Sequence, residues 1–270
     1  MARGRKGDRP LELHKRKKTA SQAHDDNPVT QERRPNPFLR SWAWKREHRP
    51  DKDRFKNPYH HDITVGGVAR TLVLHQAPFS TAGFASTVWD SAIVLAKYLE
   101  KWPETVVGKQ CIELGAGCGL AGIAAAALGA KKTILTDFPE NLPLLDRNAA
   151  ANSLTDVVST APLTWGSELA LEVLKFDVVL ATDIMYYDDA VEPLLVTLQG
   201  LSGKNTKIFM AYGRNRQAEA TFMRAVEKCT LSMRKLPDSE LDDVYQCVDV
   251  DVYELSTRGN ENENENGILT

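Results

Sequence analysis

The sequence predicts an α/β protein built around a doubly wound, mostly parallel sheet. Short apolar runs alternate with helical segments from about residue 110 to residue 230, as is typical of parallel strands joined by crossover helices. A glycine-rich turn follows the first run, and the last strand candidate alternates valine with aspartate. Ligands of such sheets bind beyond the carboxyl ends of the strands, so we expect the chemistry there.

Two elements are expected ahead of the sheet. Residues 63–76, ITVGGVARTLVLHQ, form two short strand-like runs around a Gly-Gly pair, which indicates a β-hairpin. Residues 90–102, DSAIVLAKYLEKW, place apolar side chains on one side of a helix.

Seven strands and five helices are then expected in the domain. The strand candidates are short runs rich in apolar residues, at residues 110–114, 132–137, 157–165, 176–183, 206–213, 231–236 and 246–256. The helices between them are expected at residues 119–130, 140–152, 166–174, 189–201 and 217–229. In the last strand, valines alternate with Asp249 and Asp251, a pattern of a half-exposed strand that suits an antiparallel position at the end of the sheet.

Composition divides the chain into three parts. Residues 1–58 are rich in Pro, Arg, Lys, Asp and Asn and predict a largely disordered arm, residues 59–256 form the folded domain, and residues 257–270 form a disordered polar tail. The first 60 residues hold 17 Lys and Arg against 8 Asp and Glu, whereas the other 210 hold 17 against 28. The acidic body favours a basic partner and disfavours nucleic acid as substrate.

The sequence also carries information about the cellular compartment of the protein and about membrane, disulfide and metal sites. No run reaches the ~18–20 apolar residues of a membrane helix, and the N-terminus lacks the apolar core of a secretory signal. The cysteines form no C-x-x-C pair and have no histidine at metal spacing; they are Cys111, Cys118, Cys229 and Cys247. We therefore expect a monomer of the cytoplasm or nucleus, without disulfides and without a metal site.

The turn in residues 110–122, QCIELGAGCGLAG, indicates a nucleoside site. Gly115, Gly117 and Gly119 directly follow a strand, and Asp137 ends the next strand at about the offset of an acid that holds ribose hydroxyls. The spacing through Gly122 also fits a dinucleotide fingerprint. No Gly-Lys-Ser/Thr follows, which excludes a phosphate P-loop.

Glu113 argues against a dinucleotide. It precedes the first glycine by two residues at the strand end, where a carboxylate repels a pyrophosphate and suits a cationic ligand. A hairpin and a helix also precede this strand, whereas a dinucleotide domain often begins with it.

Five motifs in order carry a resemblance to a known family: VWDSAIVLAKYLE, ELGAGCGLAGI, ILTD, LTWG and ATDIMYY. The chain resembles the class I, seven-stranded S-adenosylmethionine-dependent methyltransferases, and more narrowly the family-16 protein lysine methyltransferases. The resemblance covers about residues 60–256, and the arm and tail have no counterpart in it. It implies a Rossmann-like sheet of seven strands with an antiparallel last strand, preceded by a β-hairpin and a helix.

The resemblance also implies a set of cofactor-binding residues. These are Trp89, Glu113, Gly115, Ala116, Gly117, Asp137, Trp165 and Thr182. Asp137 is expected to accept the ribose hydroxyls, and Trp165 to lie beside the adenine. For both Trp89 and Trp165, the alternative is an ordinary core tryptophan.

Asp183 and Tyr186 are the catalytic candidates. They form D-x-x-Y just past the fourth strand, where related enzymes acting on amines and bases carry N-P-P-Y or a similar motif. A lysine arrives mostly protonated, with a pKa of ~10.4. We expect Asp183 to orient the amine and Tyr186 to wall a narrow channel. Asp183 as a helix cap is the alternative, although Asp188 and Asp189 are better placed for that.

The resulting prediction is a protein lysine N-methyltransferase that turns S-adenosyl-L-methionine into S-adenosyl-L-homocysteine. Members of the family act on chaperones, translation elongation factors and AAA-type ATPases, and the sequence does not select among these. The alternatives are another acceptor (histidine, arginine, an N-terminal amine or a small molecule), a cofactor-binding interaction module without turnover, and a nicotinamide-dependent oxidoreductase.

Overall fold

The computed structural model of the 270-residue chain describes residues 57–77, 87–167, 176–185, 187–213, 218–246 and 249–258. Nearly all of the predicted arm, residues 1–58, and of the predicted tail, residues 257–270, lies outside the described residues. The helix expected at residues 166–174 also lies mostly outside them. These three segments stay predictions.

Seven strands form one sheet. They are β3 (Gln110–Leu114), β4 (Lys132–Asp137), β5 (Val158–Pro162), β6 (Val178–Thr182), β7 (Lys207–Gly213), β8 (Leu231–Lys235) and β9 (Val250–Thr257). Their order is β5-β4-β3-β6-β7-β9-β8, with β5 to β7 parallel and β9 antiparallel to both of its neighbours. The predicted seven-stranded, mostly parallel sheet with an antiparallel last strand is confirmed.

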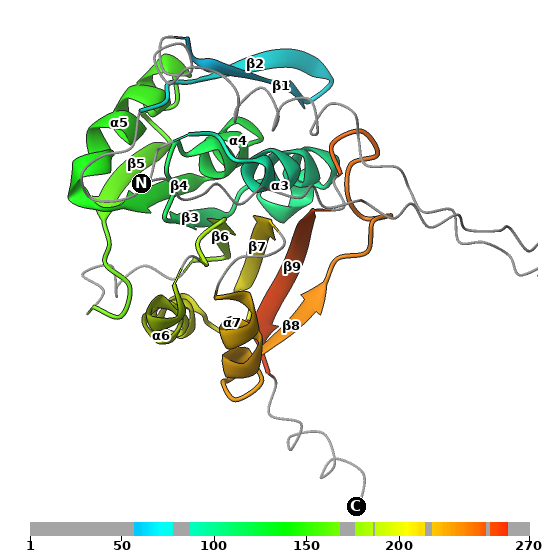
Figure 1. The fold of residues 1–270 in the computed structure, drawn as a ribbon. Helices are drawn as coiled ribbons and strands as arrows, with labels where there is room; N and C mark the ends of the chain where they lie inside the picture. Colours follow the sequence, from blue (N-terminus) through cyan, green and yellow to red (C-terminus); the bar gives the residue numbers. More distant parts are fainter. Residues whose placement is uncertain are drawn as a thin grey trace, which may run out of the picture. The chain divides into compact units, whose positions relative to one another are not determined.

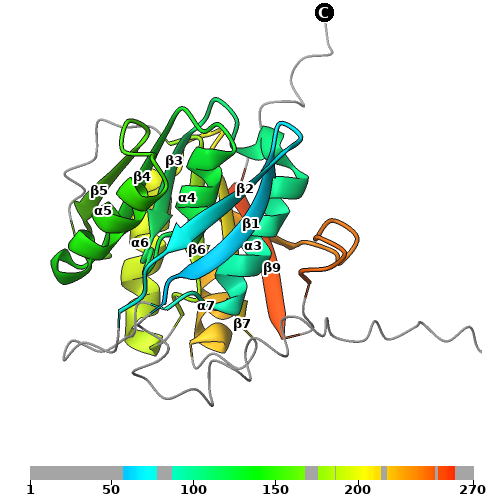
Figure 2. The same ribbon diagram turned by 90° about the horizontal axis from the view of Figure 1, so that it is seen from above.

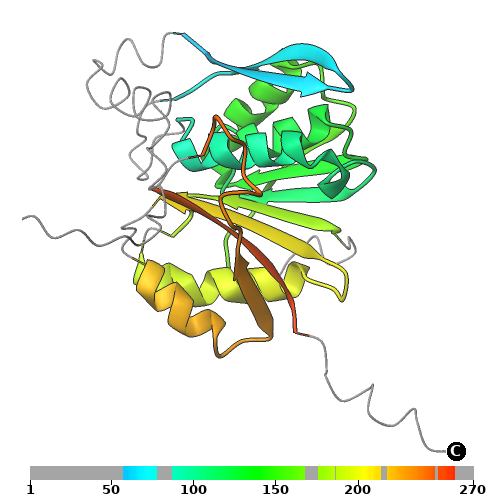
Figure 3. The ribbon, with the colours of Figure 1, turned by 90° about the vertical axis from the view of Figure 1, so that its right-hand side faces the viewer.

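Helices cover both faces of the sheet (Figures 1 and 3). On one face lie α3 (Asp90–Lys101), α4 (Leu120–Ala127) and α5 (Leu142–Ala151), and on the other lie α6 (Val191–Leu201) and α7 (Glu219–Val226). Single turns of 3₁₀ helix occur at η1 (Pro103–Thr105), η2 (Pro139–Asn141) and η3 (Asp188–Ala190). Each face buries its own apolar core. Among the described helices, none has the length and apolar character needed to cross a membrane.

The central strands are buried on both faces, which is why their sequences read as nearly continuous apolar runs. Every residue of β6 is buried, and β3 is buried from Cys111 to Leu114. Helix α4 is buried along its whole length, because six of its eight residues are glycine or alanine and let it approach the sheet closely. This packing fixes the loops that follow β3 and β6.

The predicted hairpin consists of β1 (Tyr59–Val65) and β2 (Val68–Leu74), which pair with each other and lie over α3 and α4 (Figure 2). Gly66 and Gly67 make the turn at φ of 56° and 82°, a region that glycine enters without steric cost.

Two buried asparagines, Asn148 of α5 and its C-cap residue Asn152, attach the hairpin to the domain. The amide of Asn152 accepts from Val73 N at 2.8 Å and donates to Val73 O at 2.9 Å. The amide of Asn148 makes the same pair of bonds to His75, at 2.8 and 3.0 Å, and its Nδ2 also donates to Cys118 O at 2.9 Å. Asn148 therefore links the hairpin to the loop after β3.

The position of β9 corrects one expectation. The strand does not end the sheet, because β8 pairs along its far side, and Asp251 is only 9% exposed. Its carboxylate pairs with Lys235 of β8 at 2.7 Å. Asp251 is thus part of an ion pair across strands rather than a solvent-facing residue of an edge strand, whereas Asp249 precedes β9 and is exposed.

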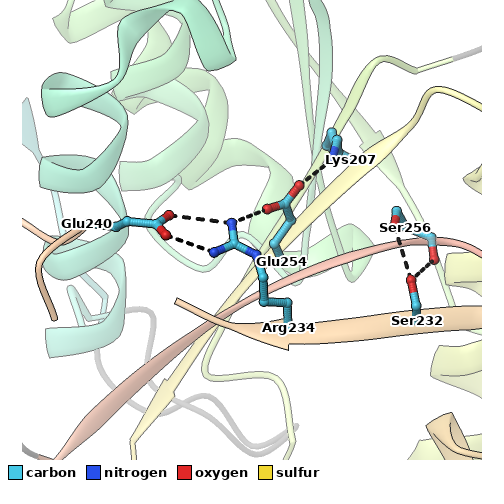
Figure 4. Close-up of polar contacts among 6 residues, drawn as sticks. All are labelled: Lys207, Ser232, Arg234, Glu240, Glu254 and Ser256. Carbon is cyan, nitrogen blue, oxygen red and sulfur yellow. Dashed lines mark hydrogen bonds and ion pairs between the residues drawn. The ribbon is translucent and has the colours of Figure 1, made fainter. Parts of the chain in front are cut away.

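A second set of ion pairs joins the same strands (Figure 4). Glu254 of β9 pairs with Lys207 of β7 and with Arg234 of β8, the latter at 2.6 Å. Arg234 also pairs with Glu240 at 2.8 Å, in the segment between β8 and β9. The antiparallel end of the sheet is therefore joined by side chains as well as by its backbone.

Candidate active site

The predicted site residues lie where β3, β4, β5 and β6 end, and at the start of α3. Because β4, β3 and β6 are adjacent and parallel, the loops that follow them meet at one edge of the sheet. From β3 the chain continues to β4 and β5 on one side of β3, and it then crosses to β6 on the other side. The strand order therefore reverses next to β3, and ligands of α/β sheets bind at such a switch point.

The loop after β3 has a bare backbone. Gly115, Gly117 and Gly119 have φ of 56°, 57° and 80°, and Ala116 N donates to Thr136 O at 2.9 Å. A Cβ built on Gly117 would meet no atom within 4 Å, so open space lies beside this residue. A Cβ on Gly115 would lie 3.0 Å from Ile184 Cγ2 and 3.3 Å from Trp165 Cζ2. The loop is therefore open at Gly117 and walled at Gly115.

Asp137, at the end of β4, holds this loop. Its Oδ2 accepts from Gly117 N at 2.8 Å and from Asn141 Nδ2 at 2.9 Å, and its Oδ1 accepts from Phe138 N at 2.7 Å. Asn141 Nδ2 also donates to Gly117 O at 2.7 Å. Asn141 was not among the residues predicted from the sequence, although its position four residues after the acid, in a turn, was a usable signal.

Trp165 comes after β5, because that strand ends at Pro162 rather than at residue 165. The indole is half-buried and lies against Gly115. The next residue, Gly166, has φ of 78° and donates its N–H to Thr197 Oγ1 of α6 at 2.9 Å. Helix α6, whose apolar core Trp165 packs against, therefore helps to fix where this tryptophan lies.

Glu113 is fully buried and faces helix α4. Its Oε2 accepts from Gly122 N at 2.8 Å, and Oε1 has no hydrogen-bond partner among the described residues. A Cβ on Gly122 would lie 2.8 Å from this carboxylate and would overlap Leu135 Cδ2. Gly122 thus serves the close packing of α4 on the sheet, which is sufficient to explain why the spacing also fits a dinucleotide fingerprint.

Burial raises the pKa of the Glu113 carboxyl to about 8, while the Gly122 N–H acts in the opposite direction and the nearby charge of Asp137 raises it further. The carboxyl of the unfolded chain ionises near 4.5. Between about pH 5 and pH 8 the folded protein therefore binds more protons than the unfolded chain, and its free energy of unfolding falls as the pH rises.

Glu113→Gln is expected to remove this pH dependence, which amounts to at most about 1.4 kcal/mol per pH unit. Glutamine keeps an acceptor for Gly122 N and has no proton to lose. Urea unfolding of both proteins at several pH values between 5 and 8 measures the slope, with Glu140→Gln, an exposed position, as the matched control. Equal slopes in wild type and Glu113→Gln would contradict the expectation.

Asp183 directly follows β6 and is 3% exposed. Its φ of 53° lies in the left-handed region, which aspartate enters more readily than most residues other than glycine. Its Oδ2 accepts from Ser91 Oγ at 2.8 Å and its Oδ1 from Gly213 N at 3.0 Å. The contact with Ser91 brings the start of α3 to the end of β6, and no sequence pattern linked the two.

The remaining predicted residues surround these loops. Trp89 is the half-buried N-cap residue of α3, with its carbonyl accepting from Ala92 N and Ile93 N. Thr182, the last residue of β6, is buried. Tyr186 lies outside the described residues, and its role stays a prediction. The expectation that Asp188 and Asp189 are better placed as helix caps is wrong: both lie within the turn η3, the N-cap of α6 is Ala190, and that cap makes no side-chain hydrogen bond.

The chain matches one protein-family model and is similar to several characterised proteins. A family model described as "Lysine methyltransferase" matches residues 70–229. Protein N-lysine methyltransferase METTL21A of Mus musculus is 34% identical over 174 residues, which are 63% of this chain and 79% of the mouse protein. EEF1A lysine methyltransferase 3 of Xenopus tropicalis is 39% identical over 168 residues, which are 62% of this chain and 74% of the frog protein.

Solved structures share the fold. The 16S rRNA N2 G1207 methyltransferase RsmC of T. Thermophilus, solved with AdoMet and guanosine, has a TM-score of 0.52 and 17% identity. The alignment covers 75% of this chain and 51% of that one. At this identity the likeness concerns the arrangement of the sheet and helices alone.

Proposed function

We propose, from the premise that this chain belongs to the lysine methyltransferase family, that the edge formed by the loops after β3, β4 and β6 is its methyl-transfer site. The protein is an S-adenosylmethionine-dependent protein lysine methyltransferase. The roles of individual residues, given below, are part of the proposal.

One observation carries this placement. Ile184, the residue after Asp183, lies against Gly115: its Cγ2 is 3.0 Å from the position of a Cβ on that glycine. The loop proposed to hold the methyl donor and the loop proposed to hold the acceptor are therefore in direct contact. Methyl transfer needs the two reacting groups in line at short range, which this contact provides for.

The loop after β3 fits the methyl donor. The open space beside Gly117 lets a ligand approach the backbone, and Asp137 lies within hydrogen-bonding reach of that backbone. We assign Asp137 to the ribose, Trp165 to the adenine, and the backbone of residues 115–117 to the amino-acid and ribose parts. A carboxylate offers about four acceptor positions, so Asp137 can share its oxygens between Gly117, Asn141 and a sugar hydroxyl.

Three further residues complete the proposed cofactor set. Trp89 is the N-cap of α3, two residues before Ser91, and Thr182 is the last residue of β6, next to Asp183. Glu113 lies behind the loop, and its bond from Gly122 N holds α4, the helix that follows the loop, against β3. When bound here, S-adenosylmethionine supplies an electrophilic methyl group on a sulfonium sulfur and leaves as S-adenosylhomocysteine.

The acceptor side needs an oriented, deprotonated amine. A lysine ammonium has a pKa of ~10.4 and loses its proton more easily when it is desolvated. A carboxylate beside it works against that loss, so we assign Asp183 to holding the amine in line by a hydrogen bond. Tyr186, three residues further on, is proposed to desolvate the amine and to contact it through its ring.

The substrate is proposed to be a protein with a lysine on a basic surface, because the body of this chain is acidic. The Xenopus tropicalis relative is named as a lysine methyltransferase of EEF1A. EEF1A is therefore the first protein to try, followed by chaperones and AAA-type ATPases. The cytoplasm and the nucleus are the proposed compartments.

The test is transfer of tritiated methyl groups from S-adenosylmethionine into proteins of a cell lysate, and into purified EEF1A, followed by mass spectrometry of the labelled peptide. We expect label on lysine, and competition by S-adenosylhomocysteine. Label on histidine, arginine or an N-terminal amine would replace the proposed acceptor. Label in RNA alone would reject the proposal. The absence of any label would also reject it, provided that calorimetry shows that the same protein binds the cofactor.

A further inference from the structure

We infer that Ser91 is a positioning residue for methyl transfer, which acts by fixing the carboxylate of Asp183. The inference rests on the proposed function, since it assumes that Asp183 orients the acceptor amine. It concerns a residue far from the D-x-x-Y motif in sequence, on the helix that precedes the sheet.

The contact between the two residues is direct and buried. Ser91 Oγ lies 2.8 Å from Asp183 Oδ2, although 92 residues separate them along the chain. Ser91 is 0% exposed, and Asp183 is 3% exposed. A hydroxyl has one proton to donate, and a bond from it to an ionised carboxylate is of the stronger, charge-assisted kind. Water does not compete for this bond as it would at the surface.

A second donor holds the other oxygen. Gly213 N, at the end of β7, donates to Asp183 Oδ1 at 3.0 Å. The carboxylate is thus held at both oxygens by donors from two separate elements, α3 and β7. Its plane can turn only if one of the two bonds breaks.

The backbone of Asp183 is fixed as well. Its N–H donates to Ala211 O at 2.8 Å, which prolongs the pairing of β6 with β7 by one residue. Its φ of 53° then turns the chain out of the sheet. With the backbone fixed, the side-chain torsions remain as the freedom of the carboxylate, and Ser91 and Gly213 remove it.

Loss of the Ser91 hydroxyl should therefore affect turnover more than cofactor binding. A carboxylate free to rotate presents its oxygens to the amine in many orientations, and small errors in the geometry of reacting groups are costly. We expect Ser91→Ala to lower the rate of methyl transfer at saturating S-adenosylmethionine on the order of tenfold. The affinity for S-adenosylhomocysteine should stay within about twofold, because the Asp137 and Gly117 contacts do not involve Ser91.

A double-mutant cycle separates this role from a structural one. Wild type, Ser91→Ala, Asp183→Asn and the double variant are compared for initial rates of tritium transfer into one lysate. If Ser91 acts through Asp183, the serine substitution should cost nothing further once Asp183 is asparagine. A merely structural serine would multiply the two losses, and that result would overturn the inference, as would an unchanged rate in Ser91→Ala.

Two further variants serve as a control for serine substitution and as a check on loss of stability. Ser202→Ala is the matched control, because its hydroxyl donates to Leu198 O at 2.6 Å at the end of α6 and its loss should leave the rate unchanged. Should Ser91→Ala lower the melting temperature, Ser91→Cys fills the same space with a weak donor and should still lose rate. A wild-type protein that transfers no methyl group would reject the proposed function instead, so the two failures are distinct.

Discussion

Asp183→Asn is expected to lower the rate of methyl transfer at least about a hundredfold while the affinity for S-adenosylhomocysteine changes little. Asparagine keeps the size of the side chain and also tolerates the left-handed φ of 53° found at this position. The backbone bond from Asp183 N to Ala211 O should therefore survive. The substitution removes the charged acceptor that is proposed to hold the amine in line by a hydrogen bond.

The substitution also disturbs the two donors at this side chain. Ser91 Oγ and Gly213 N both donate to the carboxylate, whereas an amide offers one oxygen and one NH₂ group. The serine hydroxyl can rotate to accept from the NH₂ group, so the fold should be retained. Initial rates of tritium transfer and calorimetry with S-adenosylhomocysteine measure the two effects separately.

Asp189→Asn is the matched control, since Asp189 is exposed in the turn η3 and lies a few residues further along the chain. It should retain the wild-type rate. An Asp183→Asn protein that is as active as wild type would remove Asp183 from the catalytic step. Equal loss of rate and of cofactor affinity would move it to the cofactor site.

Gly122→Ala is expected to lower the free energy of unfolding by about 2–4 kcal/mol, although alanine is the better helix former. The new Cβ would overlap Leu135 Cδ2 and come within 2.8 Å of Glu113 Oε2. Helix α4 would have to move away from the sheet, and the bond from Gly122 N to the buried carboxylate would be stretched or lost. Urea unfolding followed by circular dichroism measures the change.

Gly203→Ala provides the comparison for this helix substitution. The same Cβ built there would meet only Thr206 Oγ1, at 3.7 Å, which is ordinary contact. This variant should be as stable as wild type or slightly more so, because alanine restricts the unfolded chain. If Gly122→Ala were also within about 0.5 kcal/mol of wild type, the close packing of α4 would not be essential.

The glycine loop could be predicted from the sequence because its determinants are local. Three glycines with positive φ follow a buried strand, and the acid that bonds to Gly117 N ends the next strand. The hairpin was equally local, with its turn set by Gly66 and Gly67. Each of these features depends on residues that are close together in sequence or on the regular spacing of strands and helices.

What could not be predicted depends on partners distant in the sequence. Ser91 reads as one more small residue of a helix, and only the fold brings it to Asp183. Asp251 reads as a solvent-facing residue, because its ion pair with Lys235 leaves no trace in the pattern of its own strand. The end of β5 before Trp165 was missed for a similar reason, since Thr197 of α6 anchors the turn that follows.

The two asparagines at the C-terminal half and the C-cap of α5, Asn148 and Asn152, affect how molecules of this protein can associate. A strand whose backbone groups face outward without partners can recruit a strand from another molecule, and a two-stranded hairpin has two such edges. At the end of β2 and just beyond it, the amides of Asn152 and Asn148 occupy the outward backbone groups of Val73 and His75. These side chains act as a short substitute strand, so the C-terminal end of that edge is closed to intermolecular β-pairing by two residues rather than by a whole extra strand.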